Sequence, residues 1–213
     1  MTCTRTVYIV DDDAIVRRSC ATLVQNAGHA PHPFASGEDF VEALDYLDDG
    51  CVLLDVHMPG LSGLDVQDRL TDRGSDMPVI IMTGESDIPT AVRAIKQGAM
   101  HFIEKPFADD HLLETITAAF EQLDLRLAHG TRRREAMHKI DTLTRREQEV
   151  MNGVASGRAN KVIAREIGIS VRTVEMHRGN IMRKLGIHST GEVLKIILDA
   201  GMGLDALPRR PIG

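Results

Sequence analysis

The sequence contains no tryptophan, and aromatic residues make up only 3% of its 213 residues. Its three cysteines, Cys3, Cys20 and Cys51, lack the spacing of a zinc site, and their odd number argues against a disulfide framework. No run approaches the roughly 18 apolar residues that a membrane helix needs, and the first ten residues lack a signal-peptide core. These absences favour a reduced, cytoplasmic protein with no membrane partner.

The formal net charge of −6 conceals an acidic half and a basic half. Residues 1–125 contain 8 Lys and Arg against 22 Asp and Glu, a charge of −14, whereas residues 126–213 contain 17 against 9, a charge of +8. The length favours two modest domains. An acidic domain suits a cation or phosphoryl site, and a basic domain suits an anionic partner such as nucleic acid.

Five short apolar runs alternate with helix-period sequence in the acidic half. They cover residues 7–10, 30–34, 51–54, 79–82 and 100–103. This alternation predicts an α/β fold, a five-stranded parallel, doubly wound (flavodoxin-like) sheet with helices on both faces. Ser36 is placed to cap a helix, and helices are expected to stop at Gly28, Gly74 and Gly98.

Polar side chains follow several of these predicted strands. The residues concerned are Asp11, Asp12 and Asp13 after the first strand, Asp55 after the third, Thr83 after the fourth and Lys105 after the fifth. The carboxyl ends of parallel strands meet at one edge of the sheet. Asp11, Asp12 and Asp55 would form an oxygen-ligand cluster suited to Mg²⁺, with Lys105 offsetting the excess negative charge. Taken alone, the acidic triplet is equally consistent with a solvated turn.

The motifs at these strand ends resemble those of receiver domains in two-component response regulators. They are residues 10–13, 55–63, 83–84 and 102–107, in matching order over about residues 4–125. The resemblance implies that Asp55 accepts a phosphoryl group from a sensor histidine kinase. It also implies Mg²⁺ bound by Asp12, Asp55 and the backbone carbonyl of His57, with Asp11 acting through water.

The same resemblance assigns roles to three further residues. Lys105 would pair with a phosphoryl oxygen, and Thr83 would donate its hydroxyl to another. Movement of Thr83 would vacate space that Phe102 fills by changing rotamer, which makes these two residues the expected switch.

The basic half predicts four short helices. Thr144 and Glu147 form a capping box before a helix that ends at Ala155, and further helices are expected at about residues 160–167, 171–185 and 190–200. Short helices with glycine-containing turns suggest an all-α helix-turn-helix domain. Residues 126–139 are interpreted as an interdomain linker of undecided conformation, with Arg132 to Arg134 as a solvated hinge rather than a DNA-binding arm.

The third of these helices has an apolar face and a polar face. Val174, His177, Ile181 and Leu185 recur at helical spacing and should face the core. On the opposite face, Glu175 can accept from cytosine, Met176 can contact a thymine methyl, and Gly179 permits close approach to DNA. Residues suited to phosphate contacts are Lys161, Arg172, Thr173, Arg178, Arg183 and Lys184.

Residues 143–150, 157–164 and 169–177, with Lys184 and Leu185, resemble a LuxR-type effector domain over about residues 140–203. The whole chain therefore resembles response regulators of the FixJ/NarL type, nearest the FixJ subgroup. The implied domains are a receiver at 1–125, a linker at 126–139 and a DNA-binding domain at 140–213. The resemblance implies a transcription factor, not an enzyme, in which phosphorylation promotes homodimerisation and promoter binding, with activation and RNA polymerase contact as further expectations.

Two other functions are consistent with part of the sequence. An aspartate-nucleophile phosphatase or phosphotransferase would need a second acid or base in an Asp-x-Asp arrangement, whereas Asp55 is followed by Val56 and His57. A DNA-binding protein with a degenerate receiver would not need the complete set of acids, Thr83 and Lys105. The first alternative predicts sustained turnover of small phosphate esters by an isolated 1–125 fragment. The second predicts equal DNA affinity of the wild type and Asp55→Asn after acetyl phosphate treatment.

Overall fold

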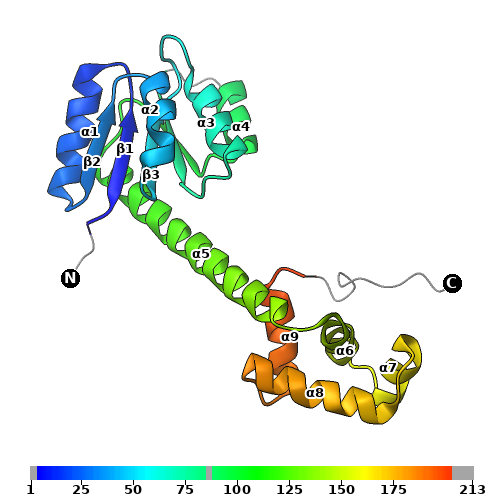
Figure 1. Ribbon diagram of the computed structural model, residues 1–213. Coiled ribbons are helices and arrows are strands. Elements are labelled where there is room, and N and C mark those ends of the chain that lie inside the picture. Colours follow the sequence, from blue (N-terminus) through cyan, green and yellow to red (C-terminus); the bar gives the residue numbers. More distant parts are fainter. Residues whose placement is uncertain (1–3, 85–87, 203–213) are drawn as a thin grey trace. The chain divides into compact units, whose positions relative to one another are not determined.

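The computed structural model describes residues 4–84 and 88–202 (Figure 1). The chain divides into two compact units between Leu127 and Ala128. This division lies two residues beyond the expected end of the first domain at residue 125. Each unit has its own buried core, so the two units are described separately.

The N-terminal unit alternates strands and helices. Its elements are β1 (Thr6–Val10), α1 (Ala14–Asn26), β2 (Ala30–Phe34), α2 (Gly37–Ala43), the 3-10 helix η1 (Leu44–Tyr46), β3 (Gly50–Asp55), α3 (Gly63–Asp72), β4 (Val79–Thr83), α4 (Ile88–Lys96), β5 (His101–Glu104) and α5 (Asp109–Asp141). All strands pair in parallel, in the order β2-β1-β3-β4-β5. The predicted doubly wound fold is confirmed, with its switch point between β1 and β3.

Helices cover both faces of this sheet (Figure 1). On one face, Val24 of α1 and Ile116 of α5 pack against alternate strand residues; on the other, Phe40 of α2, Leu70 of α3 and Ala94 of α4 do so. The central strand β3 is buried along its whole length. Its polar terminal residue, Asp55, is therefore buried as well.

Local sequence determines where the helices of this unit begin and end. The Ser36 hydroxyl accepts a hydrogen bond from the Asp39 N–H and so caps α2. Gly28, Gly74 and Gly98 follow the ends of helices with positive φ angles of 87°, 65° and 95°. Glycine reaches this left-handed region without the steric cost that other residues incur, so the predicted helix stops are confirmed.

The C-terminal unit contains four helices after α5 within the part of the chain that the structure describes. They are α6 (Arg145–Ala155), α7 (Asn160–Ile167), α8 (Val171–Leu185) and α9 (Thr190–Asp199). The predicted capping box is present, because Thr144 and Glu147 each accept a hydrogen bond from the other's backbone N–H. Gly168, with φ of 69°, makes the turn between α7 and α8. This arrangement confirms the expected helix-turn-helix elements.

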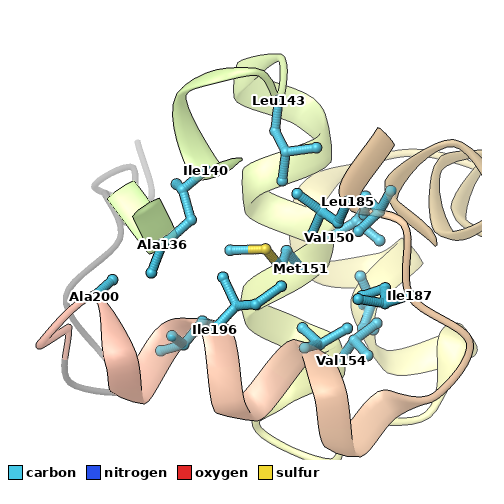
Figure 2. Close-up of a cluster of buried hydrophobic side chains, with 14 of the residues drawn as sticks. Ala136, Ile140, Leu143, Val150, Met151, Val154, Leu185, Ile187, Ile196 and Ala200 are labelled. Carbon is cyan, nitrogen blue, oxygen red and sulfur yellow. The ribbon is translucent and has the colours of Figure 1, made fainter. Parts of the chain in front are cut away.

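The sequence left the conformation of the expected linker open. Residues 126–139 are helical, because α5 continues to Asp141. Ala136 and Ile140 are buried in the core of the C-terminal unit and face Met151, Ile196 and Ala200 (Figure 2). The last turns of α5 thus belong structurally to the C-terminal unit, although their exposed arginines suggested a solvated connection. No helix in the described residues is long and apolar enough to span a membrane.

Candidate functional site

The first candidate site is an acidic pocket at the carboxyl edge of the sheet. Asp11 follows β1 and is fully buried, whereas Asp55 ends β3 and is 5% exposed. Lys105 follows β5, and its Nζ atom lies 2.6 Å from Asp11 Oδ2 and 2.7 Å from Asp55 Oδ1. Thr83, at the end of β4, is also buried. The parallel strands therefore bring together residues that are far apart in the sequence.

The Lys105 ammonium forms ion pairs with both carboxylates of this pocket. Burial, opposed by the hydrogen bond from Lys105, raises the pKa of Asp55 above its ordinary value, and the nearby Asp11 adds to the rise. Burial would lower the pKa of Lys105, but its hydrogen bonds to both carboxylates outweigh burial and raise it. The two directions are consistent, because the three groups together retain an uncompensated negative charge.

That residual charge bears on whether the pocket suits Mg²⁺. Carboxylate and carbonyl oxygens are the ligands that Mg²⁺ favours, and Asp12 is exposed beside the buried acids. Within residues 4–84 and 88–202, no group of three or more His, Cys, Asp or Glu side chains is preassembled to hold a metal. Lys105 instead lies between Asp11 and Asp55. The oxygen ligands of the pocket fit a hard cation such as Mg²⁺. The side chains of the expected acidic cluster are not already positioned to coordinate one together.

The loop after Asp55 lies close beneath it. The Gly63 N–H donates to the Val56 carbonyl, and a Cβ at Gly63 would lie 2.1 Å from the Asp55 carbonyl oxygen. Glu38 Oε1 accepts from the Leu61 N–H at 2.7 Å. Sequence reasoning missed this role of Glu38, because the two residues belong to different elements and no local motif links them.

The expected switch residues Thr83 and Phe102 lie on the paired strands β4 and β5. Thr83 Oγ1 is 3.5 Å from Nδ1 of the exposed His57 ring. The His57 backbone N–H also donates to the Asp55 carboxylate. Phe102 is half-buried and packs against the core cluster that includes Ile81 and Ala94. The proposed movements of Thr83 and Phe102 stay predictions.

The second candidate site is the exposed face of α8. Val174, Ile181 and Leu185 are buried, as expected, and the His177 ring is only half-buried. The predicted reading residues are all exposed, with Met176 at 55%. These residues are Glu175, Met176 and Gly179. A polar helical face with an exposed methionine is suited to a major groove.

Several residues predicted to bind phosphates already have partners within the protein. The Arg178 guanidinium donates to Asn160 Oδ1 at 2.8 Å. Thr173 shares a 2.8 Å hydrogen bond with Ser170. Further contacts join Arg183 to Asn180, and Lys184 to Glu147. Lys161 and Arg172 are exposed. The DNA contacts of all these side chains stay predictions.

Comparison with known proteins gives each unit a family. The profile described as "Response regulator receiver domain" matches residues 7–117. The profile described as "Bacterial regulatory proteins, luxR family" matches residues 141–197. The acidic pocket lies within the first match and the exposed face of α8 within the second. Together they define the class: a response regulator with a DNA-binding output domain.

Relatives match over nearly the whole chain. The transcriptional regulatory protein FixJ of Bradyrhizobium diazoefficiens is 40% identical over 196 residues, which cover 92% of this chain and 96% of FixJ. The response regulator protein TodT of Pseudomonas putida strain F1 is 39% identical, over 89% of this chain and 84% of TodT. Among solved structures, the response regulator StyR is 35% identical with a TM-score of 0.78, over 92% and 99% of the two chains.

A crystal structure of full-length FixJ from B. japonicum is also similar, with 39% identity and a TM-score of 0.60 over 94% of this chain and 98% of that one. This chain belongs to the FixJ-like response regulators, which join a receiver domain to a LuxR-type DNA-binding domain. These relatives are transcriptional regulators and not enzymes. Membership implies a sensor kinase as the partner of the receiver and DNA as the partner of the output domain.

Proposed function

We propose that this chain is a transcriptional regulator controlled by phosphorylation of Asp55 by a sensor histidine kinase. The position of Lys105 carries the proposal, because its ammonium lies 2.7 Å from Asp55 and can neutralise an incoming phosphoryl oxygen. Phosphorylation promotes homodimerisation and binding to promoter DNA. The protein acts in the cytoplasm, where that DNA lies, and as an activator, with RNA polymerase as a further partner.

The proposed reaction forms one bond and breaks another. An Asp55 carboxylate oxygen bonds to phosphorus while the bond from phosphorus to the kinase's histidine nitrogen breaks, and the nitrogen keeps the electron pair. Asp12, Asp55 and the His57 backbone carbonyl would hold Mg²⁺, with Asp11 acting through water, and the bound ion would supply positive charge that offsets the crowded oxygens. Lys105 pairs with one phosphoryl oxygen as a point charge.

Phosphorylation of Asp55 changes the residues around the pocket, and this change controls DNA binding. The Thr83 hydroxyl donates to a second phosphoryl oxygen, and Phe102 changes rotamer into the space that Thr83 leaves. The surface of α4, β5 and α5 then takes a form that favours a dimer. A phosphoryl group thus acts as an added charge that biases a two-state element.

In the proposed DNA complex, α8 lies in the major groove. Glu175 and Met176 contact base edges, and Gly179 allows close approach of the helix. The phosphate contacts are assigned to Lys161, Arg172, Thr173, Arg178 and Arg183. A symmetric dimer binds two half-sites about one helical turn, roughly 10 base pairs, apart.

Phosphate incorporation into the full-length protein tests the proposal. Radiolabelled acetyl phosphate with Mg²⁺ is expected to label the unmodified chain, shift it towards a dimer in size-exclusion chromatography and increase its retention of promoter DNA. The substitution Asp55→Asn is expected to reduce labelling to background because it removes the nucleophile. Chelation of Mg²⁺ is expected to do the same because it removes the positive counter-charge. Asp72→Asn, an exposed site on α3, is the matched control.

Two results would contradict this proposal. Equal DNA retention by the treated wild type and the treated Asp55→Asn variant would indicate a receiver that does not control output. Sustained turnover of small phosphate esters by the wild type would indicate a phosphatase instead.

The predicted faces of α8 are tested by a pair of substitutions. Arg172→Ala is expected to weaken binding to all DNA sequences and to reduce the slope of log Kd against log salt by about 0.9, one phosphate contact. Met176→Ala is expected to leave that slope unchanged and alter the preference among sequences. Filter binding at several salt concentrations measures both effects, and the reverse pattern would refute the assigned face.

A further inference from the structure

Three helix ends of the C-terminal unit meet in one polar junction. The residues of this junction are Thr142, Thr144, Glu147, Gln148 and Lys184. They belong to the chain that leaves α5, the first turn of α6 and the last turn of α8. Because the last carbonyls of a helix have no partner within it, such ends need other donors.

Lys184 provides the link between the three helices. Its Nζ atom lies 2.6 Å from Glu147 Oε2 on α6 and 3.4 Å from the Thr142 carbonyl oxygen that follows α5. The same Glu147 oxygen accepts from the Thr144 N–H at 2.8 Å. One carboxylate therefore caps α6 and holds the end of α8 at the same time.

Gln148 completes the junction on the side of α5. Its Nε2 atom donates to the Ile140 carbonyl at 3.2 Å and to the Leu143 carbonyl at 3.4 Å. The carbonyls at the end of α5 thus receive donors from α6 and α8.

The central carboxylate of the junction is buried. Glu147 is 3% exposed, and the Lys184 side chain is 33% exposed. Burial would raise the pKa of Glu147, but hydrogen bonds from Lys184 and Thr144 outweigh it and hold this pKa below its ordinary value. Glu147 is therefore ionised at neutral pH, and removing Lys184 would leave a buried charge without its partner.

The neighbouring arginine differs in its surroundings. Arg183 is exposed, as Lys184 is, but its guanidinium donates to Asn180 Oδ1 of the same helix at 2.9 Å. This contact joins residues of one turn and ties α8 to no other helix. Arg183 and Lys184 are thus adjacent basic residues at the end of α8 with different partners.

We infer that Lys184 is a positioning residue that sets how α8 is presented to DNA, and not a phosphate ligand. The inference rests on the proposed function, in which α8 contacts DNA. Lys184 acts through Glu147: the ion pair holds the last turn of α8 against the ends of α5 and α6. Losing it displaces the reading face while leaving the number of phosphate contacts unchanged.

The test compares full-length Lys184→Met with Arg183→Met. The probes are a duplex enriched from a random pool by the acetyl phosphate-treated wild type and a random-sequence duplex of the same length. Lys184→Met is expected to weaken binding to the enriched duplex by about tenfold, the loss of one base contact, with an unchanged salt slope and little effect on the random duplex. Arg183→Met is expected to weaken both and reduce the slope by about 0.9.

The variant Glu147→Gln distinguishes more sharply between Lys184 as a positioning residue and Lys184 as a phosphate ligand. In this variant Lys184 keeps its charge and loses its partner, so the inference expects the same fall in preference for the enriched duplex. A phosphate ligand released from Glu147 would bind both duplexes as tightly as before or more tightly. If Lys184→Met does not fold, the double variant Glu147→Gln/Lys184→Met, which has no unpaired buried charge, takes its place.

Different results would contradict the role of Lys184 and the proposed function of α8. A smaller salt slope for Lys184→Met, or an unchanged ratio of enriched to random affinity, would overturn the inference. If neither Arg183→Met nor Met176→Ala changed binding, the assignment of α8 to DNA would fail instead. Rescue of the preference by Lys184→Arg, which restores a cation beside Glu147, is expected.

Discussion

Replacing Ile140 with aspartate is expected to destabilise the C-terminal unit strongly while the stability of the N-terminal unit stays unchanged. Ile140 is 2% exposed and faces Met151 and Ile196 (Figure 2). The substitution removes a buried apolar side chain and places a charge among apolar neighbours. We expect a cost of about 4 kcal/mol, a large fraction of the stability of a small domain.

Tyrosine fluorescence separates the two units in this experiment. Both tyrosines, Tyr8 and Tyr46, lie in the N-terminal unit. Circular dichroism at 222 nm should therefore lose the helical signal of the C-terminal unit at lower temperature, while the tyrosine transition stays in place. Met137→Asp is the matched control, because Met137 is 37% exposed on the same helix. Equal effects of the two substitutions would mean that this end of α5 is only a connection.

Replacing Lys105 with methionine is expected to destabilise the receiver domain by about 3 kcal/mol at neutral pH. The substitution leaves Asp11 and Asp55 buried without the ammonium that now bridges them. Two like charges then share a pocket of low polarity. Lys96→Met, an exposed site on α4, is the control and should change stability by less than about 0.5 kcal/mol.

The loss of stability in Lys105→Met should grow as pH rises. The pKa of Asp55 is already raised above its ordinary value of 3.8, and removing Lys105 raises it further. A carboxyl whose pKa is raised in the folded state favours folding below its unfolded pKa, and that contribution disappears as pH rises through the folded value. Urea unfolding followed by tyrosine fluorescence should thus show a larger loss at pH 7.5 than at pH 4.5. A loss that grew towards acidic pH would contradict the assigned charges.

The elements of this fold could be predicted because their signals are local. The apolar run at residues 51–54 and the glycines that end helices act through neighbours in the chain, so the strands and helix stops were found within one or two residues. The helices of the C-terminal unit were found for the same reason, since Thr144 and Ser170 cap α6 and α8 from adjacent positions.

The candidate receiver site was predictable to a lesser degree. The rule that carboxyl ends of parallel strands share an edge identified Asp11, Asp55, Thr83 and Lys105 as one group. It did not predict that Lys105 would lie between the two buried acids, nor that Glu38 would hold the loop after Asp55. Such contacts depend on how a side chain crosses between elements, which no periodicity encodes.

By itself, the sequence determined the two-domain organisation, the order of elements and the family, because periodicity, caps and motif spacing are written in consecutive residues. Tertiary structure alone decided which unit the end of α5 joins and which basic residue of α8 has a buried partner. Ala136 and Ile140 become core residues only when α6 and α9 pack against them. Lys184 meets Glu147 only when distant helix ends converge, because packing, and not chain order, brings their charges within hydrogen-bond distance.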